Sequence, residues 1–249
     1  MPDYSKNNSP GDPTDFSLVL GGPFFRLLRW AHLTDNKLIL VRRRIIFISL
    51  LTWLPLLVLA ILQGQLLGGE VTTPFLLDVE VHVRFLVALP LLIGCELLVH
   101  QRLRNIVRQF LERNLIPDNA MERFEAAISS ASSLRNSVVA EALLIVFVYG
   151  VGVMIIWRHY VALDAASWYA IPSTEGAKLS FAGVWYGYVS LPIFQFLLGR
   201  WYYRLFIWMR FLWQVSRIKL NLVPTHPDRV GGLGFITTAV SALLLIAIA

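Results

Sequence analysis

The first long apolar stretch of the chain, Ile45–Leu67, follows directly on three consecutive arginines at positions 42–44. About twenty apolar residues are enough for a helix to cross the hydrocarbon core of a membrane. A soluble domain carries about 25% charged residues, whereas this chain has 15% and gathers its apolar residues into long runs. We therefore expect an all-α, polytopic transmembrane helical protein.

Further apolar runs predict the number of crossings. Three of them fit the length of a membrane span, at residues 76–99, 138–157 and 181–198. A last run, residues 235–249, is short for a crossing. We expect a transmembrane domain over residues 45–249 with four complete spans and the start of a fifth. We favour a chain truncated at its C-terminus, as a fragment of a longer protein, over a short or re-entrant last helix.

The distribution of basic residues predicts the orientation of these spans. Of the 22 lysines and arginines, 19 fall in residues 1–44, 100–137 and 200–234, and 3 fall in residues 68–84 and 158–180. Basic residues concentrate on the cytoplasmic side of membrane proteins. We expect a cytoplasmic N-terminus, a cytoplasmic helical loop at 100–137, a periplasmic loop at 158–180 and a cytoplasmic motif loop at 222–235.

The N-terminal region, residues 1–44, is not predicted to cross the membrane. Residues 1–15 are polar and predict a disordered cytoplasmic tail, whereas residues 16–44 predict an interfacial cytoplasmic segment lying on the bilayer. An ordinary juxtamembrane segment is the alternative for the latter. The net charge of +6 is explained by basic residues beside apolar runs, so we expect the lipid bilayer and anionic inner-leaflet lipids as partners, with no nucleic acid.

Several common catalytic motifs are missing from the sequence. It contains no GxxxxGK[ST], GxGxxG, HExxH, CxxC or GxSxG string. This argues against the common ATPases, dehydrogenases, zinc proteases and serine hydrolases, and makes an enzyme the less favoured class. The sequence identifies neither a cofactor nor a metal.

Three ionisable residues fall near the inner ends of predicted spans and form a candidate intramembrane polar site. Glu96 and His100 stand four apart, which puts them on one face of a helix. Glu141 offers a second carboxylate at a similar depth on another span. A carboxylate inside a membrane is costly unless it is paired. The functional interpretation is a proton relay or part of a metal site; the alternative is that each acid pairs with its own arginine, or Glu96 with His100.

The segment after the fourth span carries a stripe of arginines. At 100° per residue, the polar stripe falls within about 140° of helix circumference, and its arginines are Arg200, Arg204, Arg210 and Arg217. One interpretation is a site for a lipid headgroup or another anion. The other is a helix end lying along the anionic inner leaflet and anchored by aromatic residues.

A predicted helix start and a glycine motif give further detail on two of the spans. Thr73 and Pro74 predict a helix start, with Thr73 as the cap. A helix there would pair Asp78 only with His82, whereas a strand would align Asp78, Glu80, His82 and Arg84 on one face. We favour the helix, so no four-residue cluster is expected. Gly183 and Gly187 form a GxxxG motif, which favours close helix packing.

The loop 222–235 contains the chemically densest stretch of the chain, PTHPDRVGGLGF. Pro224 and Pro227 keep the chain out of a helix, and Asp228 can cap a following turn. Left-handed backbone or close backbone approach is permitted at Gly231, Gly232 and Gly234.

Two interpretations of this loop remain open. As a site, its amides near a helix start suit an anion, with Arg229 assisting, while His226 and Asp228 suit a divalent cation or a proton. As a structural element, it is a turn that returns the chain to the membrane and is tied by its own hydrogen bonds.

The string HPDRVGGLGF resembles a signature of uncharacterised bacterial inner-membrane proteins, in which His-Pro-Asp and Gly-Gly-Leu-Gly-Phe precede a membrane span. The match covers about residues 220–236. The resemblance implies the bacterial inner membrane as the location and relatives longer than this chain. It implies no reaction.

The sequence supports three classes of function. We expect a transport, channel-like or sensing component that uses polar residues near the cytoplasmic face. A membrane-embedded enzyme acting on a lipid or polyprenyl phosphate is the alternative. A non-catalytic interaction subunit, in a homo-oligomer or a membrane complex, is the third.

Overall fold

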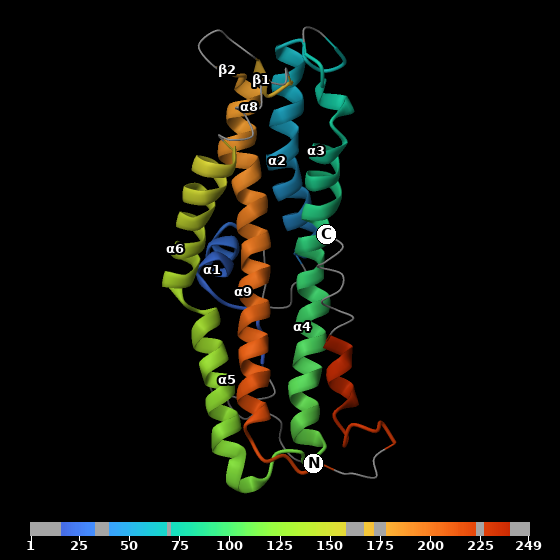
Figure 1. Ribbon diagram of the computed structural model, residues 1–249, viewed down its shortest axis with the longest axis vertical. Helices are drawn as coiled ribbons and strands as arrows, with labels where there is room; N and C mark the ends of the chain where they lie inside the picture. The colour runs from blue at the N-terminus through green and yellow to red at the C-terminus, as the bar shows by residue number, and fades with distance from the viewer. Residues whose placement is uncertain are drawn as a thin grey trace. The chain divides into compact units, whose positions relative to one another are not determined.

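The structure is a computed structural model that describes residues 16–32, 40–68, 71–157, 167–171, 178–222 and 227–239. Most of these residues are helical (Figure 1). The described strands are β1 (Ala170–Ile171) and β2 (Lys178–Leu179), which pair antiparallel. The predicted all-α fold is confirmed.

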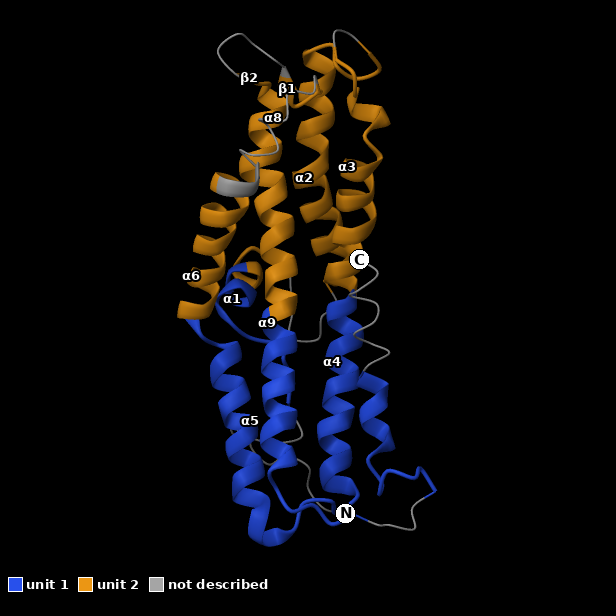
Figure 2. Cartoon of the chain, in the orientation of Figure 1, with its two compact units in different colours: residues 1–27, 95–138, 203–247 blue, residues 28–94, 139–202, 248–249 orange. Residues whose placement is uncertain are grey.

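The chain divides into two compact units, coloured separately in Figure 2. Unit 1 comprises residues 1–27, 95–138 and 203–247. Unit 2 comprises residues 28–94, 139–202 and 248–249.

Three described helices are long and apolar enough to cross a membrane, and a bent pair is a fourth candidate. The three are α2 (Val41–Leu62), the continuous helix Val79–Glu112 and the continuous helix Phe181–Ser216. The bent pair joins Asp118–Arg135 to Val138–Met154 at 45°. This identifies the chain as a helical membrane protein with three or four candidate spans among its described residues; the run 235–249 is described only to residue 239.

The two longest helices are built from shorter elements. Val79–Glu112 consists of α3 (Val79–Val83), a π-helical turn (Arg84–Ala88) and α4 (Leu89–Glu112). Phe181–Ser216 consists of α8 (Phe181–Trp185), a π-helical turn (Tyr186–Ser190) and α9 (Leu191–Ser216). The other helices and helical turns are α1 (Pro23–Trp30), Phe75–Leu77, Asp118–Ala120, α5 (Met121–Arg135), α6 (Val138–Phe147), the π-helix Val148–Trp157 and Gly234–Ile236.

The first span begins and ends earlier than predicted. It starts at Val41, so the three arginines lie inside its first turns. Its end is fixed by Gly64, whose φ of 68° lies in the left-handed region. The Gly64 amide donates to the Ile61 carbonyl at 3.0 Å and the Gln65 amide to the Ala60 carbonyl at 2.9 Å. This pair of bonds is a Schellman motif, which stops a helix at the residue before the glycine.

The predicted helix start at Thr73 and Pro74 is wrong. Pro74 precedes the short turn Phe75–Leu77, and Thr73 forms a bridge with Ser167. The next helix, α3, starts after Asp78, whose carboxylate accepts from the Val81 amide at 3.2 Å. Aspartate is a strong N-cap because its oxygen satisfies an amide that the first turn leaves free.

Unit 2 is held by packing around one tryptophan and by polar contacts between its helices. Trp168 is fully buried, and its ring meets Phe75 edge to face at 5.1 Å. The Ser190 hydroxyl donates to the Thr52 carbonyl at 2.7 Å and so links Phe181–Ser216 to α2. Exposed apolar side chains of unit 2 include Phe47 and Val58 of α2 and Val146 of α6. Such large exposed apolar surfaces are typical of a lipid-facing protein.

Unit 1 has an aromatic core that joins its three chain segments. Phe124 of α5 lies 5.9 Å from Phe110 of α4 and 6.1 Å from Phe211 of α9, measured between ring centroids. Phe16, from the segment predicted to lie on the bilayer, stacks on Phe211 at 5.2 Å. Phe16 is 2% exposed and Val19 is 1% exposed. The described start of the chain is therefore part of this core.

Candidate functional site

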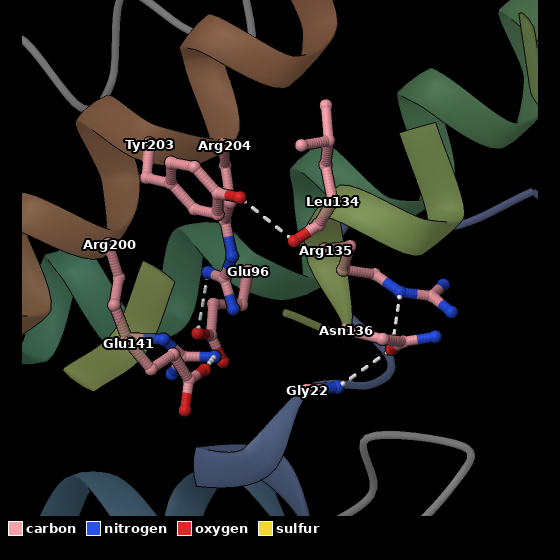
Figure 3. Close-up of polar contacts among 9 residues, drawn as sticks. All are labelled: Gly22, Glu96, Leu134, Arg135, Asn136, Glu141, Arg200, Tyr203 and Arg204. Atoms are coloured by element: carbon pink, nitrogen blue, oxygen red, sulfur yellow. Dashed lines mark hydrogen bonds and ion pairs between the residues drawn. The ribbon is translucent and has the colours of Figure 1, made fainter. Parts of the chain in front are cut away.

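A strongly buried charge pair in unit 1 joins two helices that qualify as membrane spans. Glu96 of α4 accepts from the Arg204 guanidinium of α9 at 2.7 Å (Figure 3). Their side chains are 6% and 8% exposed, respectively. An isolated charge in so buried a place is costly, and a close, hydrogen-bonded partner of opposite sign offsets that cost. Glu96 therefore pairs with an arginine, which is the alternative that the sequence left open.

A second ion pair has the same composition and belongs to unit 2. Arg200 of α9 lies 3.4 Å from a carboxylate oxygen of Glu141 on α6 (Figure 3). Both side chains are about as buried as those of the first pair, at 8% and 10%. Glu141, like Glu96, therefore pairs with an arginine.

His100 makes a contact that the sequence did not indicate. Its Nδ1 lies 2.8 Å from the Ser17 hydroxyl. Ser17 is buried and also accepts from the amides of Val19 and Leu20. The imidazole therefore meets the N-terminal segment inside unit 1.

The predicted arginine stripe is divided between buried and exposed environments. Arg200 and Arg204 are buried in ion pairs. Arg210 donates to the Ser130 hydroxyl at 3.1 Å, and the Arg217 guanidinium lies 5.2 Å from the Trp213 ring centroid. Of the four, only Arg217 is exposed. A single headgroup-binding stripe made of all four arginines does not fit this arrangement.

Asp228 organises the described part of the motif loop. Its carboxylate accepts from three amides of the same loop, those of Val230 and Gly232 at 3.0 Å and that of Gly234 at 2.8 Å. Left-handed backbone lets the amides converge, with φ of 58° at Arg229, 68° at Gly231 and 97° at Gly232. These amides already hold an anion, the carboxylate of Asp228.

The loop is also fixed to the end of α4. Arg113 donates to the Gly232 carbonyl at 3.1 Å, and its guanidinium lies over the Phe235 ring at 5.1 Å. Phe235 in turn packs edge to face against Phe110 at 5.1 Å. The amides that suited an external anion are therefore part of a closed turn. His226 lies outside the described residues.

Sequence reasoning missed the contacts that anchor the N-terminal segment of unit 1. Asn136, in the break between α5 and α6, accepts from the Gly22 amide at 3.0 Å (Figure 3). Arg135 donates to the Ser17 carbonyl, and the Tyr203 hydroxyl donates to the Leu134 carbonyl at 2.9 Å. An asparagine just after a serine-rich helix was the only sequence signal for this junction.

Comparison with protein-family models, with curated proteins and with solved structures gives no match.

Proposed function

We propose that this protein is a membrane transport component in which a proton moves by way of Glu96. The observation that carries the proposal is the buried Glu96–Arg204 ion pair on helices that qualify as membrane spans. Ionisable residues inside spans are rare and commonly mark ion or proton pathways.

Stability alone is a weak reason for such a pair. Replacing a buried ion pair by apolar side chains of similar volume is often neutral or stabilising. A carboxylate held by an arginine can, however, act as an exchangeable group. When the guanidinium moves away, the carboxylate binds a proton and becomes neutral, and the returning guanidinium favours release of that proton.

We also propose an orientation and a location for the protein. The excess of basic residues in 1–44, 100–137 and 200–234 supports a cytoplasmic N-terminus. The alternation of these segments with the apolar runs also supports four complete spans and a fifth beginning at residue 235. The basic residues favour contact with anionic lipids of the inner leaflet. The resemblance of HPDRVGGLGF supports the bacterial inner membrane. We favour a homo-oligomer or a membrane complex as the working assembly.

The structure of the loop reduces support for the enzyme alternative. An enzyme acting on a lipid or polyprenyl phosphate needs donors free to bind phosphate oxygens. The amides of Gly232 and Gly234 donate to Asp228. For this reason we do not propose that activity.

The proposal is tested by proton flux in reconstituted vesicles. A pH-sensitive dye inside the vesicles reports flux driven by a membrane potential, for wild type, Glu96→Gln and Glu112→Gln. Glu112 is the matched control because it lies on the same α4 helix in an exposed pair with Arg108, at 3.4 Å. We expect flux in wild type and Glu112→Gln, and its loss in Glu96→Gln with the fold retained.

Two results would overturn this function. Vesicles of wild type without any flux would point to the interaction subunit. Flux that survives in Glu96→Gln, with only a lower melting temperature, would reduce the ion pair to a structural role.

A further inference from the structure

His82 is half-buried in unit 2, and its two ring nitrogens differ in their partners. Nδ1 lies 2.7 Å from the Asp78 carbonyl oxygen. A carbonyl oxygen only accepts, so Nδ1 carries a hydrogen and the neutral ring has its lone pair on Nε2. Nε2 is buried and has no hydrogen-bond partner among the described residues. His82 therefore holds a basic nitrogen without a proton donor.

Two aromatic rings lie beside the His82 ring, and one of them carries a hydrogen-bond donor without an acceptor among the described residues. The His82 ring lies 5.9 Å from the Trp53 ring, edge to face, and 5.1 Å from the Phe75 ring. The indole Nε1 of Trp53 is also buried without a hydrogen-bond partner among the described residues. Among the described residues, the Trp53 indole N–H thus lacks an acceptor and His82 Nε2 lacks a donor. The two rings, on α2 and α3, are neighbours.

We propose that His82 Nε2 is a proton-binding site that controls the contact between α2 and α3 at the end of unit 2 that carries β1 and β2. In the neutral state, Nε2 is an acceptor on the ring next to the Trp53 indole. When a proton binds the lone pair, an N–H bond forms and the ring gains one positive charge. Both imidazole nitrogens are then donors, and the Trp53 N–H has no acceptor.

Among the described residues, the charged groups near His82 leave the new N–H without an anion. Asp78, one turn away, accepts from the Val81 amide at 3.2 Å and from the Trp168 indole at 2.9 Å. Glu80 is paired with Arg84, which also donates to the Tyr186 hydroxyl. Residues 45–62 of α2 contain no charged side chain, and the segment 167–171 has Tyr169 as its titratable group.

Proton uptake is therefore expected to loosen this end of unit 2. A buried cation without a hydrogen-bond acceptor is unfavourable, and the ring leaves the aromatic contact to reach water. Histidine is the side chain whose ordinary charge change falls between about pH 5 and pH 8. The inference goes beyond the proposed function, because it requires neither Glu96 nor proton flux.

Tryptophan fluorescence between about pH 8 and pH 5 tests the proposal. The chain has 8 tryptophans, so the variants supply the assignment. We expect a reversible change in wild type, its loss in His82→Gln, and a clear reduction in Trp53→Phe. His100→Gln is the matched control and should respond as wild type does, and so should Glu96→Gln.

Two outcomes would overturn the assignment. One is a wild type that shows no fluorescence change in this interval, and the other is a change of equal size in His82→Gln. If His82→Gln does not fold, Trp53→Phe decides, because an unreduced change there excludes the Trp53 contact. A loss of flux in Glu96→Gln with an intact pH response would leave the two proposals separate.

Discussion

At the level of single residues, Asp228 shows how a loop rich in functional residue types can be explained by its own structure. One carboxylate takes the hydrogens of three amides. Part of this was predictable, because an aspartate before a glycine-rich stretch is a common cap. The contact of Arg113 with Gly232 was not predictable, because 119 residues separate the two in sequence.

Replacement of Asp228 should destabilise the loop, whereas truncation of Arg229 should not. Asp228→Ala removes a charged acceptor shared by three amides, and we expect it to lower the free energy of unfolding by about 2 kcal/mol. Arg229→Ala keeps a non-glycine residue at φ 58°, so the backbone strain is unchanged and the stability should stay near wild type. Thermal unfolding of both variants in the same detergent measures the difference. An equal loss in both would show that the Arg229 side chain is itself part of the turn.

The buried acids illustrate what sequence can and cannot decide. Glu96 and Glu141 each found an arginine because charges at membrane depth need partners of opposite sign. The particular arginines depend on how helices distant in sequence pack. His82 was interpreted only as a partner of Asp78, because the rings of Trp53 and Phe75 that enclose it come from outside its helix.

At the level of helices, the helix that carries the GxxxG motif packs against α2, and at Gly183 it also makes a close contact with a connecting segment. A β-carbon added at Gly183 would lie 2.0 Å from the backbone carbonyl oxygen of Tyr169. Sequence indicated a small residue on a packed face. It gave no sign that a connecting segment lies against that face.

Glycine-to-alanine substitutions separate this contact from helix propensity. Gly183→Ala forces backbone atoms apart, and overpacking of this kind typically costs about 1–3 kcal/mol. Gly150→Ala is the matched control, because an added β-carbon there meets nothing within 4 Å. Alanine is otherwise the better helix former by about 1 kcal/mol, so the control should melt at or above the wild-type temperature. A Gly183→Ala protein that melts as the control does would contradict the packing at Tyr169.

The ends of α2 and α4 differ from the ends of the apolar runs that predicted these helices. The Schellman motif at Gly64 ends α2 before the apolar run ends, because the backbone geometry rather than hydrophobicity sets the boundary. Helix α4 instead continues past the apolar run to Glu112. Its polar end packs in unit 1 through residues such as Phe110, which is 1% exposed.

At the level of the whole molecule, the proposed orientation predicts which positions face each side of the membrane. A cysteine at Ser129, which is exposed on α5, should be protected from an impermeant thiol reagent in intact cells. A cysteine at Ser173, in the loop 158–180, should be labelled. The native Cys95 is buried and gives a low background. Labelling at Ser129 but not at Ser173 would reverse the orientation.

The central claim is that the Glu96–Arg204 pair works in transport and does more than hold α4 to α9. The most direct test is proton flux through the charge-swapped variant, Glu96→Arg together with Arg204→Glu. Each single change places two like charges side by side in a buried place, which costs more than the about 3–5 kcal/mol of one unpaired buried charge, whereas the double change restores an ion pair between the same helices. The account predicts a double variant that folds with near wild-type stability but carries no flux, because the proton acceptor has left α4. Flux that returns together with stability would contradict it.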